Sequence, residues 1–268
     1  PTGLIGDPYV GKKYGEIWGY KVDGLFRNDK EAAEYASRID LSTVASGYYT
    51  ATGAYGKGVR GGDIKYLDLN GDNIVNGGKG TLDDPGDRRV IGNSSPRYQY
   101  GASLNFSWYG FDVSVFMQGI GRLDWYPGAD NLRFWGPYCR PYATFVPKNF
   151  MSQVWSEENP DAYFPRARAY TSLNSNSGTA YYTNDRYLQN LAYCRLKNLT
   201  IGYTIPRRLT SKVGIKECRI YFSGENLATW SALKSDFLDP EQAAADSDKK
   251  ANVYPWCKTY SIGLNLTF

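Results

Sequence analysis

The chain has 268 residues, of which 42% are hydrophobic and 16% aromatic, and its formal net charge is +4. Because the positive charges are spread along the chain and form no basic block, the sequence shows no footprint for nucleic acid. The chain contains no histidine, which excludes Ser-His-Asp triads, histidine zinc sites and imidazole general bases.

The hydropathy of the chain excludes one route through a membrane and leaves another open. The mean hydropathy is −0.51, and no apolar run approaches the roughly 18 residues that a helical span needs. A β-barrel crosses a bilayer without such a run. The 24 Tyr and 7 Trp residues favour places where one end of the ring is dry and the other wet, such as interfaces, sugar-binding surfaces and barrel girdles.

The first elements in chain order are a strand and a short helix. The chain opens with neither a charged segment nor an apolar segment of a signal peptide, which is expected of a mature or truncated product. Residues 14–26 alternate in polarity and are predicted to form a strand. Its apolar face would carry Tyr14, Trp18, Tyr20, Val22 and Phe26. A short helix is predicted over residues 29–39, with Asp29 at its start.

The next two segments predict a hairpin. Residues 98–108 alternate between an aromatic or aliphatic face and a polar face that holds Gln99, Ser103 and Asn105. After the two residues Tyr109 and Gly110, a second strand places Asp112 and Ser114 on the polar side. Two alternating segments separated by two residues are typical of a hairpin with a minimal turn.

The remaining strands are predicted near the C-terminus. Residues 199–205 alternate clearly, with Thr200 on the polar side, and residues 220–228 alternate less cleanly. Residues 259–268 place one face on Tyr260, Ile262, Leu264, Leu266 and Phe268, opposite small polar residues that include Asn265. Such a strand suits a barrel wall between lipid and a wet lumen. A half-buried strand of a soluble sheet shows the same period of two.

The connections alternate between short and long. Tyr109-Gly110 and residues 206–216 are short, whereas residues 27–97, 121–190 and 230–255 are long. Outer-membrane barrels have short periplasmic turns and long outer loops. If Phe268 lies at the periplasmic side, every long connection becomes an outer loop. The expected fold is therefore all-β: the C-terminal portion of an antiparallel transmembrane β-barrel, with about six strands. Since six strands do not close a barrel, the chain is expected to be a piece of one.

One segment resembles a calcium loop. Asp68, Asn70 and Asp72 supply side-chain oxygens at relative positions one, three and five, and Ile74 supplies an expected backbone carbonyl. Lys79 occupies position twelve, where calcium loops carry an acid, so a bound ion would need Asp83, Asp84 or Asp87. An Asx-rich turn held by its own backbone hydrogen bonds explains the same residues and fits slightly better.

Several spaced motifs resemble the SusC/RagA family of TonB-dependent outer-membrane transporters, in the order that the family has them. They span nearly the whole chain, from residues 15–20 to Phe268. The quoted motifs are Gly62-Asp63-Ile64-Lys65-Tyr66-Leu67-Asp68-Leu69-Asn70-Gly71-Asp72, Asp87-Arg88-Arg89-Val90-Ile91-Gly92-Asn93, Pro96-Arg97-Tyr98-Gln99-Tyr100-Gly101, Tyr109-Gly110-Phe111-Asp112-Val113-Ser114, residues 193–206 and residues 219–227.

The resemblance implies a barrel of about 22 strands with a plugged lumen in the outer membrane of a Gram-negative bacterium. Such transporters import oligosaccharides or peptides with energy from TonB, beneath a SusD-like surface lipoprotein. The family's plug, its TonB-contacting segment and its earlier strands have no counterpart here. Residues 1–268 are therefore expected to be the C-terminal segment of the barrel. The resemblance also implies that the aromatic last residue, Phe268, is the signal for barrel assembly.

One predicted outer loop concentrates aromatic and arginine side chains. Flat rings and forked donors suit sugar rings or peptide carboxylates, and the candidates for contact with substrate or partner are Trp125, Tyr126, Arg133, Trp135 and Tyr138. Arg122, Arg140, Tyr142 and Phe145 belong to the same cluster. A loop that packs its own aromatics, or buries them against the partner protein, explains this composition better for most of them.

Two other functional classes are open to the sequence. A soluble, aromatic-rich carbohydrate-binding β-sandwich would explain the Tyr and Trp content, but its outward strand faces should be polar. An enzyme would need paired carboxylates, and the adjacent acids Glu157 and Glu158 lie in a polar stretch where such residues are usually solvated. The sequence therefore predicts a protein that is not an enzyme.

Overall fold

The structure is a computed structural model that describes residues 3–50, 58–139, 142, 146, 148–168, 173, 178–235, 238–243 and 256–268. It divides into two compact units. The first consists of Pro1–Ser95, Asp124–Gln189 and Ala243–Asn252, and the second of Pro96–Leu123, Asn190–Gln242 and Val253–Phe268. In the described ranges no helix is both long and apolar enough to cross a bilayer.

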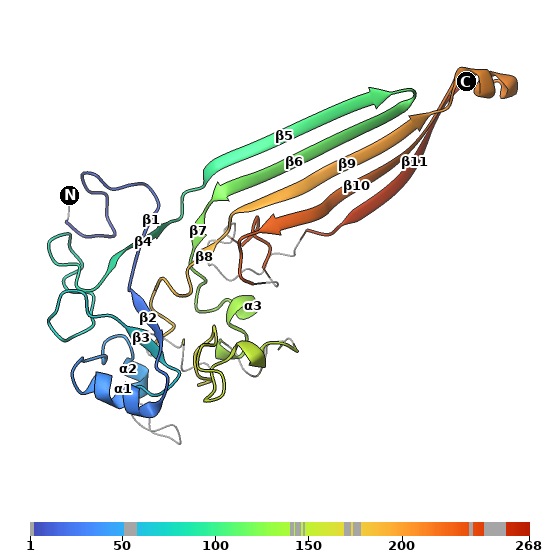
Figure 1. The fold of residues 1–268 in the computed structure, drawn as a ribbon. Helices are drawn as coiled ribbons and strands as arrows, with labels where there is room; N and C mark the ends of the chain where they lie inside the picture. Colours follow the sequence, from blue (N-terminus) through green and yellow to red (C-terminus); the bar gives the residue numbers. More distant parts are fainter. Residues whose placement is uncertain are drawn as a thin grey trace. The chain divides into compact units, whose positions relative to one another are not determined.

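The second unit is built on one five-stranded antiparallel sheet (Figure 1). Its strands lie in the order β11-β10-β9-β6-β5. Their bounds are Arg97–Trp108 for β5, Phe111–Arg122 for β6, Tyr193–Thr204 for β9, Glu217–Ser231 for β10 and Thr259–Thr267 for β11. The five strands predicted after residue 97 are thereby confirmed, together with the antiparallel all-β class.

The register of the sheet aligns side chains of like polarity in rows that cross all five strands. One row joins Asn105, Ser114, Thr200, Ser223 and Ser261. The adjacent row joins Phe106, Val113, Ile201, Phe222 and Ile262. We call the side of the first row the polar face and that of the second row the apolar face. Since side chains alternate along each strand, the sheet separates the two kinds completely along these rows.

The apolar face is exposed. Phe106 is 56% exposed, Ile201 41% and Ile262 83%. Tyr260, Leu264 and Leu266 on β11 are also more than a third exposed, as the sequence predicted for residues outside the core. Monomeric soluble proteins rarely present so large a contiguous apolar surface to water.

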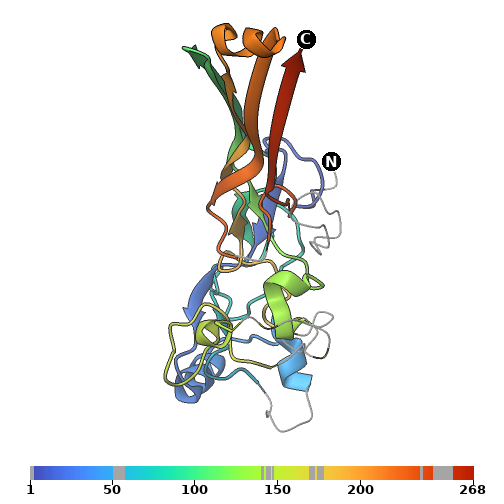
Figure 2. The same cartoon turned by 90° about the vertical axis from the view of Figure 1, so that its right-hand side faces the viewer.

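The short connections and the C-terminus lie at the same end of the sheet (Figures 1 and 2). The amide N–H of Thr204 donates to the carbonyl of Gly110 at 2.8 Å, and that of Lys216 donates to the carbonyl of Thr267 at 2.7 Å. Tyr109 and Gly110 both have positive φ, 46° and 87°, as a two-residue hairpin turn requires. The connection from β9 to β10 contains the short helices α4 (Arg207–Thr210) and η4 (Ser211–Val213).

The strand predicted over residues 14–26 is divided into two short strands in the structure. Residues 14–26 form no strand of the five-stranded sheet. They divide into β1 (Glu16–Gly19), which pairs with β4 (Arg89–Asn93), and β2 (Val22–Leu25), which pairs with β3 (Ile64–Tyr66). Tyr20 and Phe26 are buried, 5% and 0% exposed, in the first unit. Gly15 and Gly24 have positive φ, so the segment is not one extended strand, and the sheet has five strands instead of about six.

The long connections 27–97 and 121–190 contain regular structure. Helix α1 (Asp29–Ala36) confirms the helix predicted at Asp29; its N-cap is Asn28, whose side chain accepts the Glu31 amide. The other short elements are α2 (Ser46–Thr50), α3 (Leu132–Trp135), η1 (Gly136–Tyr138), η2 (Met151–Gln153), β7 (Asp124–Trp125) and β8 (Gln189–Asn190). Together these elements and the loops between them enclose a core of their own.

That core contains a buried ion pair. Arg168 Nη2 lies 2.7 Å from Asp63 Oδ2, and the two side chains are 3% and 0% exposed. The same carboxylate oxygen accepts the Arg60 amide at 2.7 Å, and the Arg168 guanidinium lies 4.0 Å from the centre of the Tyr48 ring. Burial raises the pKa of Asp63 to about 7, and the charge of Arg168 opposes that rise.

Removing one partner of this pair should destabilise the first unit strongly. Asp63→Asn puts a neutral amide in place of the carboxylate that faces the buried Arg168 guanidinium, and breaking a buried ion pair in this way costs about 3–5 kcal/mol. The double variant Asp63→Asn/Arg168→Met should lose much less, because no buried charge remains. Denaturant unfolding of the purified protein, followed by tryptophan fluorescence at a pH above about 7, measures both. Equal destabilisation by the single and double variants would contradict this account.

Candidate functional site

The aromatic candidates of the sequence lie inside the first unit. Trp125, Tyr126, Trp135 and Tyr138 are 4%, 6%, 0% and 2% exposed. Trp135 packs edge-on against Phe134, with ring centres 4.7 Å apart, and Tyr138 stacks on Phe164 at 5.8 Å. Edge-to-face and offset stacking of this kind stabilises aromatic clusters. In this structure these rings pack against one another and present no surface for a ligand to stack on.

The other residues of that cluster differ in their surroundings. Arg133 is half-buried, whereas Tyr142 is 81% exposed. Arg122 belongs to strand β6 in the second unit. Arg140 and Phe145 lie outside the described residues. Ring contacts thus join Tyr126, Trp135 and Tyr138 in one core, through Phe164 in the case of Tyr138. Trp125 is buried in the same unit.

Asn184 is the centre of the polar contacts in this core, although no sequence motif marks it. It is fully buried. Its Nδ2 donates to Tyr126 Oη at 3.0 Å and to the Tyr182 carbonyl at 2.8 Å, while its Oδ1 accepts the Tyr187 amide at 3.1 Å. Tyr126 Oη donates to the carbonyls of Ala180 and Tyr182 at 3.0 and 3.1 Å. These bonds satisfy polar atoms that would otherwise be costly to bury.

The loop that resembles a calcium site is held by its own hydrogen bonds. Asp68 accepts the amides of Gly71 and Asn73 at 2.7 and 2.9 Å, and Asp72 accepts that of Ile74 at 2.8 Å. Asn70 Oδ1 accepts the Asp72 amide at 3.0 Å. In the part of the chain that the structure describes, no three His, Cys, Asp or Glu side chains are grouped as metal ligands. Calcium binding by Asp68, Asn70, Asp72 and Ile74 stays a prediction.

Asp87 holds this loop from outside. Its side chain is fully buried, and it accepts the amides of Leu69 and Asn76 at 2.7 and 2.9 Å. The sequence offered Asp87 as a spare ion ligand. In the structure its two oxygens serve backbone donors at the two ends of the loop, so the residue fixes the loop's shape.

The polar face of the five-stranded sheet carries a charged cluster that the sequence analysis missed. Arg195 on β9 is 2% exposed, and its guanidinium contacts Asp239 and Glu241, each at 2.6 Å. Its Nε donates to Thr229 Oγ1 on β10 at 2.9 Å, and Lys197 contacts Glu241 at 2.7 Å. We call these residues the arginine clamp. It ties residues 239–241, from a predicted outer loop, to the polar face.

Comparison with known proteins finds relatives of this chain among curated proteins and solved structures. No family model matches the chain. It is 28% identical over 215 residues to TonB-dependent receptor P26 of Formosa agariphila, covering 77% of this chain and 20% of that protein. It is 25% identical over 267 residues to TonB-dependent receptor P3 of the same organism, covering 96% of this chain and 22% of that protein.

The chain is related to the TonB-dependent receptors. Its fold resembles that of the RagAB peptide transporter, with a TM-score of 0.57 and 20% identity over 94% of this chain and 22% of that chain. The RagAB peptide importer in its open-open state gives a TM-score of 0.52 at 18% identity, again over 94% and 22%. The chain spans about a fifth of the length of these proteins.

The relationship to TonB-dependent receptors confirms the resemblance predicted from the motifs and the barrel class of the sheet. The proteins that match are named as receptors and importers and not as enzymes. Phe268 is 73% exposed and follows β11 directly. The sequence resemblance implies that it is a signal for barrel assembly. The structure places it beside the two short connections, and its role in assembly stays a prediction.

The buried tyrosines predict how the first unit responds to alkaline pH. Burial raises the pKa of Tyr126 and Tyr66 well above 10.0 and that of Tyr163 to about 12. These hydroxyls hold their protons more tightly in the folded than in the unfolded state. Their contribution to stability is therefore complete below the unfolded pKa of about 10 and is lost as the pH rises toward the folded pKa.

We expect the first unit to lose stability steeply between about pH 10 and pH 12. Tyr126→Phe should lower stability at neutral pH by about 1–2 kcal/mol, because it removes the hydrogen bonds around Asn184, and should make the alkaline loss shallower. The exposed Tyr142→Phe is the matched control and should change neither. Tyrosinate absorbance and tryptophan fluorescence against pH measure this; identical curves for the two variants would refute it.

Proposed function

We propose that this chain forms part of a TonB-dependent transporter in the outer membrane of a Gram-negative bacterium and helps to import oligosaccharides or peptides. The observation that carries the proposal is the register of the five-stranded sheet. The apolar row from Phe106 to Ile262 suits lipid, and the polar row from Asn105 to Ser261 suits a wet lumen. The relationship to TonB-dependent receptors supports the same assignment.

The ends of the sheet give the proposed orientation. The turn Tyr109-Gly110, the connection that holds α4 and η4, and Phe268 lie at one end, which we assign to the periplasm because barrel turns are short there. The long segments 27–97, 121–190 and 230–255 then lead to the outer side. A SusD-like lipoprotein would meet them there, and TonB would act through parts of the protein beyond this chain. The outer strands β5 and β11 would pair with the remaining strands of the barrel.

The arginine clamp gives the polar face a proposed role at the outer side. Arg195 and Lys197 lie toward the end of β9 that is far from Phe268, and they hold Asp239 and Glu241 against the sheet. A buried guanidinium with two carboxylates fixes geometry strongly, because each partner would be costly to leave alone. We propose that the clamp sets the position of this outer loop over the lumen.

The substrate class is open to two possibilities. One solved structure with this fold is described as a peptide importer, and the motifs of the chain resemble a family that takes up oligosaccharides as well as peptides. Uptake assays in the source organism, comparing growth on defined oligosaccharides and on peptides after deletion of this gene, decide between them. Unchanged growth on both would count against a role in import.

A soluble carbohydrate-binding module is the competing proposal, and it draws on the 16% aromatic content. In the structure the candidate rings Trp125, Trp135 and Tyr138 are buried, while exposed rings such as Phe106, Trp108 and Tyr260 lie on the apolar face of the sheet. If the protein is released by washing membranes with salt and stays soluble without detergent, the soluble module is correct and the transporter is excluded.

A new charge should destabilise the protein at one residue of β9 and have little effect at its neighbour. Ile201 lies on the apolar face and Thr200 on the polar face. A lysine toward lipid costs up to about 2–4 kcal/mol, depending on its depth in the bilayer, whereas a lysine toward a wet lumen costs little. We expect Ile201→Lys to lower the unfolding free energy in lipid vesicles and the amount of folded protein in the outer membrane, and Thr200→Lys to change them slightly. The reverse order would contradict the assignment of faces.

Deletion of Phe268 should reduce insertion of the protein into the outer membrane. The residue is exposed beyond the last hydrogen-bonded pair, Glu217 with Thr267, so its loss removes few contacts from the folded sheet. We expect low surface levels of the deletion variant but normal uptake per inserted molecule. Quantitative surface labelling beside an uptake assay separates the two; normal surface levels would overturn the assembly role. Phe268→Tyr is the control and should insert normally.

A further inference from the structure

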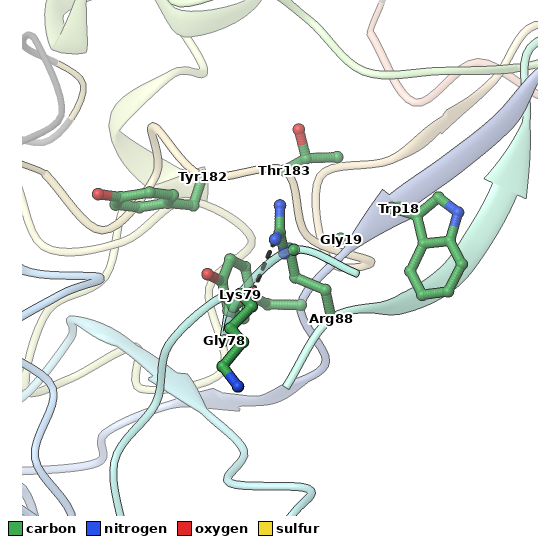
Figure 3. A pocket seen from close by; sticks show the side chains of 10 residues that line it. Trp18, Gly19, Gly78, Lys79, Arg88, Tyr182 and Thr183 are labelled. Carbon is green, nitrogen blue, oxygen red and sulfur yellow. Dashed lines mark hydrogen bonds between the residues drawn. The ribbon is translucent and has the colours of Figure 1, made fainter. Parts of the chain in front are cut away.

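The first unit contains a cavity of about 290 Å³ near the start of β4 (Figure 3). Its walls include the rings of Trp18, Tyr20 and Tyr182, the glycine-rich run Gly77–Gly80 and the side chain of Arg88. Tyr20 and Tyr182 meet edge to face with ring centres 5.9 Å apart. The volume is near the lower end of the range for ligand pockets, so it suits a small group and not a long chain.

Arg88 has few partners for a half-buried cation. Its Nη2 donates to the Gly77 carbonyl at 2.7 Å. Its Nε is buried and has no hydrogen-bond partner among the described residues, and none of the ion pairs that the described ranges contain involves Arg88. A buried donor without an acceptor costs free energy, and so does a partly desolvated charge without a counter-ion. An anion bound in the cavity would supply the counter-ion that this charge lacks.

The nearby acids leave this charge uncompensated. Asp87 precedes Arg88 directly, but its oxygens accept the amides of Leu69, Asn70 and Asn76. Asp84 lies against Gly78, where an added Cβ would meet its Oδ1, and it forms no ion pair in the part of the chain described. Lys79 lines the cavity as a second cation, exposed and likewise outside the ion pairs of the described residues.

The glycine run keeps the cavity open beside Arg88. A Cβ at Gly77 would lie 3.0 Å from Cζ, Nε and Nη2 of Arg88, so the guanidinium sits directly on the backbone. Gly78 and Gly80 have positive φ, 52° and 72°, which a side chain would disfavour. The planar fork of an arginine pre-positioned in this way matches the two oxygens of a carboxylate.

We propose that this cavity binds the carboxylate group of a small ligand, with Arg88 as its forked donor, Lys79 as a second positive charge and the aromatic walls packing the ligand's flat or apolar part. Among peptides and sugars, this group is found at the carboxyl end of a peptide and in an acidic sugar. The proposal goes beyond the transport function proposed above and does not depend on it, since binding is a property of the first unit.

Calorimetric titration of the protein purified from membranes with its natural partners tests the proposal. The probes are N-acetylphenylalanine against its amide, and galacturonate against galactose. We expect one acid of the two pairs to bind and its neutral counterpart to bind at least about tenfold more weakly, because hydrogen bonds to a charged group are lost. The pair that responds identifies the peptide or the sugar source. Failure of both acids to bind would overturn the proposal, as would equal binding of an acid and its neutral counterpart.

Variants of adjacent arginines give a matched control. Arg88→Gln should weaken binding of the acid about tenfold or more, whereas Arg89→Gln should leave it unchanged, because Arg89 donates to the carbonyls of Gly86 and Arg88 and does not line the cavity. If Arg88→Gln fails to fold, Lys79→Gln serves in its place, since that side chain is exposed, and should weaken binding severalfold. Unchanged binding in the variant that folds, or tighter binding of inorganic phosphate than of either acid, would refute the carboxylate site.

Discussion

The second unit depends on one constraint, the hydrogen-bonded register of five antiparallel strands. Side chains alternate with a period of two, so a slip of one residue in any strand would move its apolar side chains onto the polar face. The observed register keeps the two kinds apart along the row from Asn105 to Ser261 and the row from Phe106 to Ile262. Register shifts occur farther along, between Phe116 and Met117 and between Glu225 and Ala228. The position of the short turns, the exposure of the apolar face and the place of Phe268 all follow from it.

Polar groups on the polar face reinforce that register. Arg219 on β10 reaches over Gly202 to Asp112 on β6, with Nη2 and Oδ2 2.5 Å apart. A Cβ at Gly202 would lie 2.5 Å from Nη2 of Arg219, so the glycine on the central strand makes this contact between its two neighbours possible. At the other end of β9, the arginine clamp joins the sheet to residues 239–241. Both contacts fall on the same face: Arg219 pairs with Thr204, and the register shift between Asn198 and Leu196 brings Arg195 opposite Gln118, on the polar side.

The first unit is organised differently. Its segments have little regular secondary structure, and aromatic packing together with buried polar bonds takes the place of a sheet. Asn184, Asp87 and the Asp63–Arg168 pair each satisfy several backbone or side-chain groups of distant segments. Short elements joined by long loops form few backbone-to-backbone hydrogen bonds. Side chains must therefore supply partners for the remaining buried N–H and C=O groups. This explains why a segment rich in Gly, Asn and Tyr forms a defined core.

The sequence by itself determined the strands of the second unit, their faces and the Tyr109-Gly110 turn, because period-two polarity and turn residues are local signals. Its spaced motifs also indicated the relationship to TonB-dependent receptors. It also identified the helix that starts at Asp29. Only the tertiary structure decided that residues 14–26 belong to the first unit, that Trp135 and Tyr138 are buried, and that Arg88 and Arg195 occupy special environments. An alternating segment reads the same whether its apolar face meets lipid or a protein core. The environment of a charged side chain likewise depends on residues distant in the chain, such as Asp239 for Arg195 and Gly77 for Arg88.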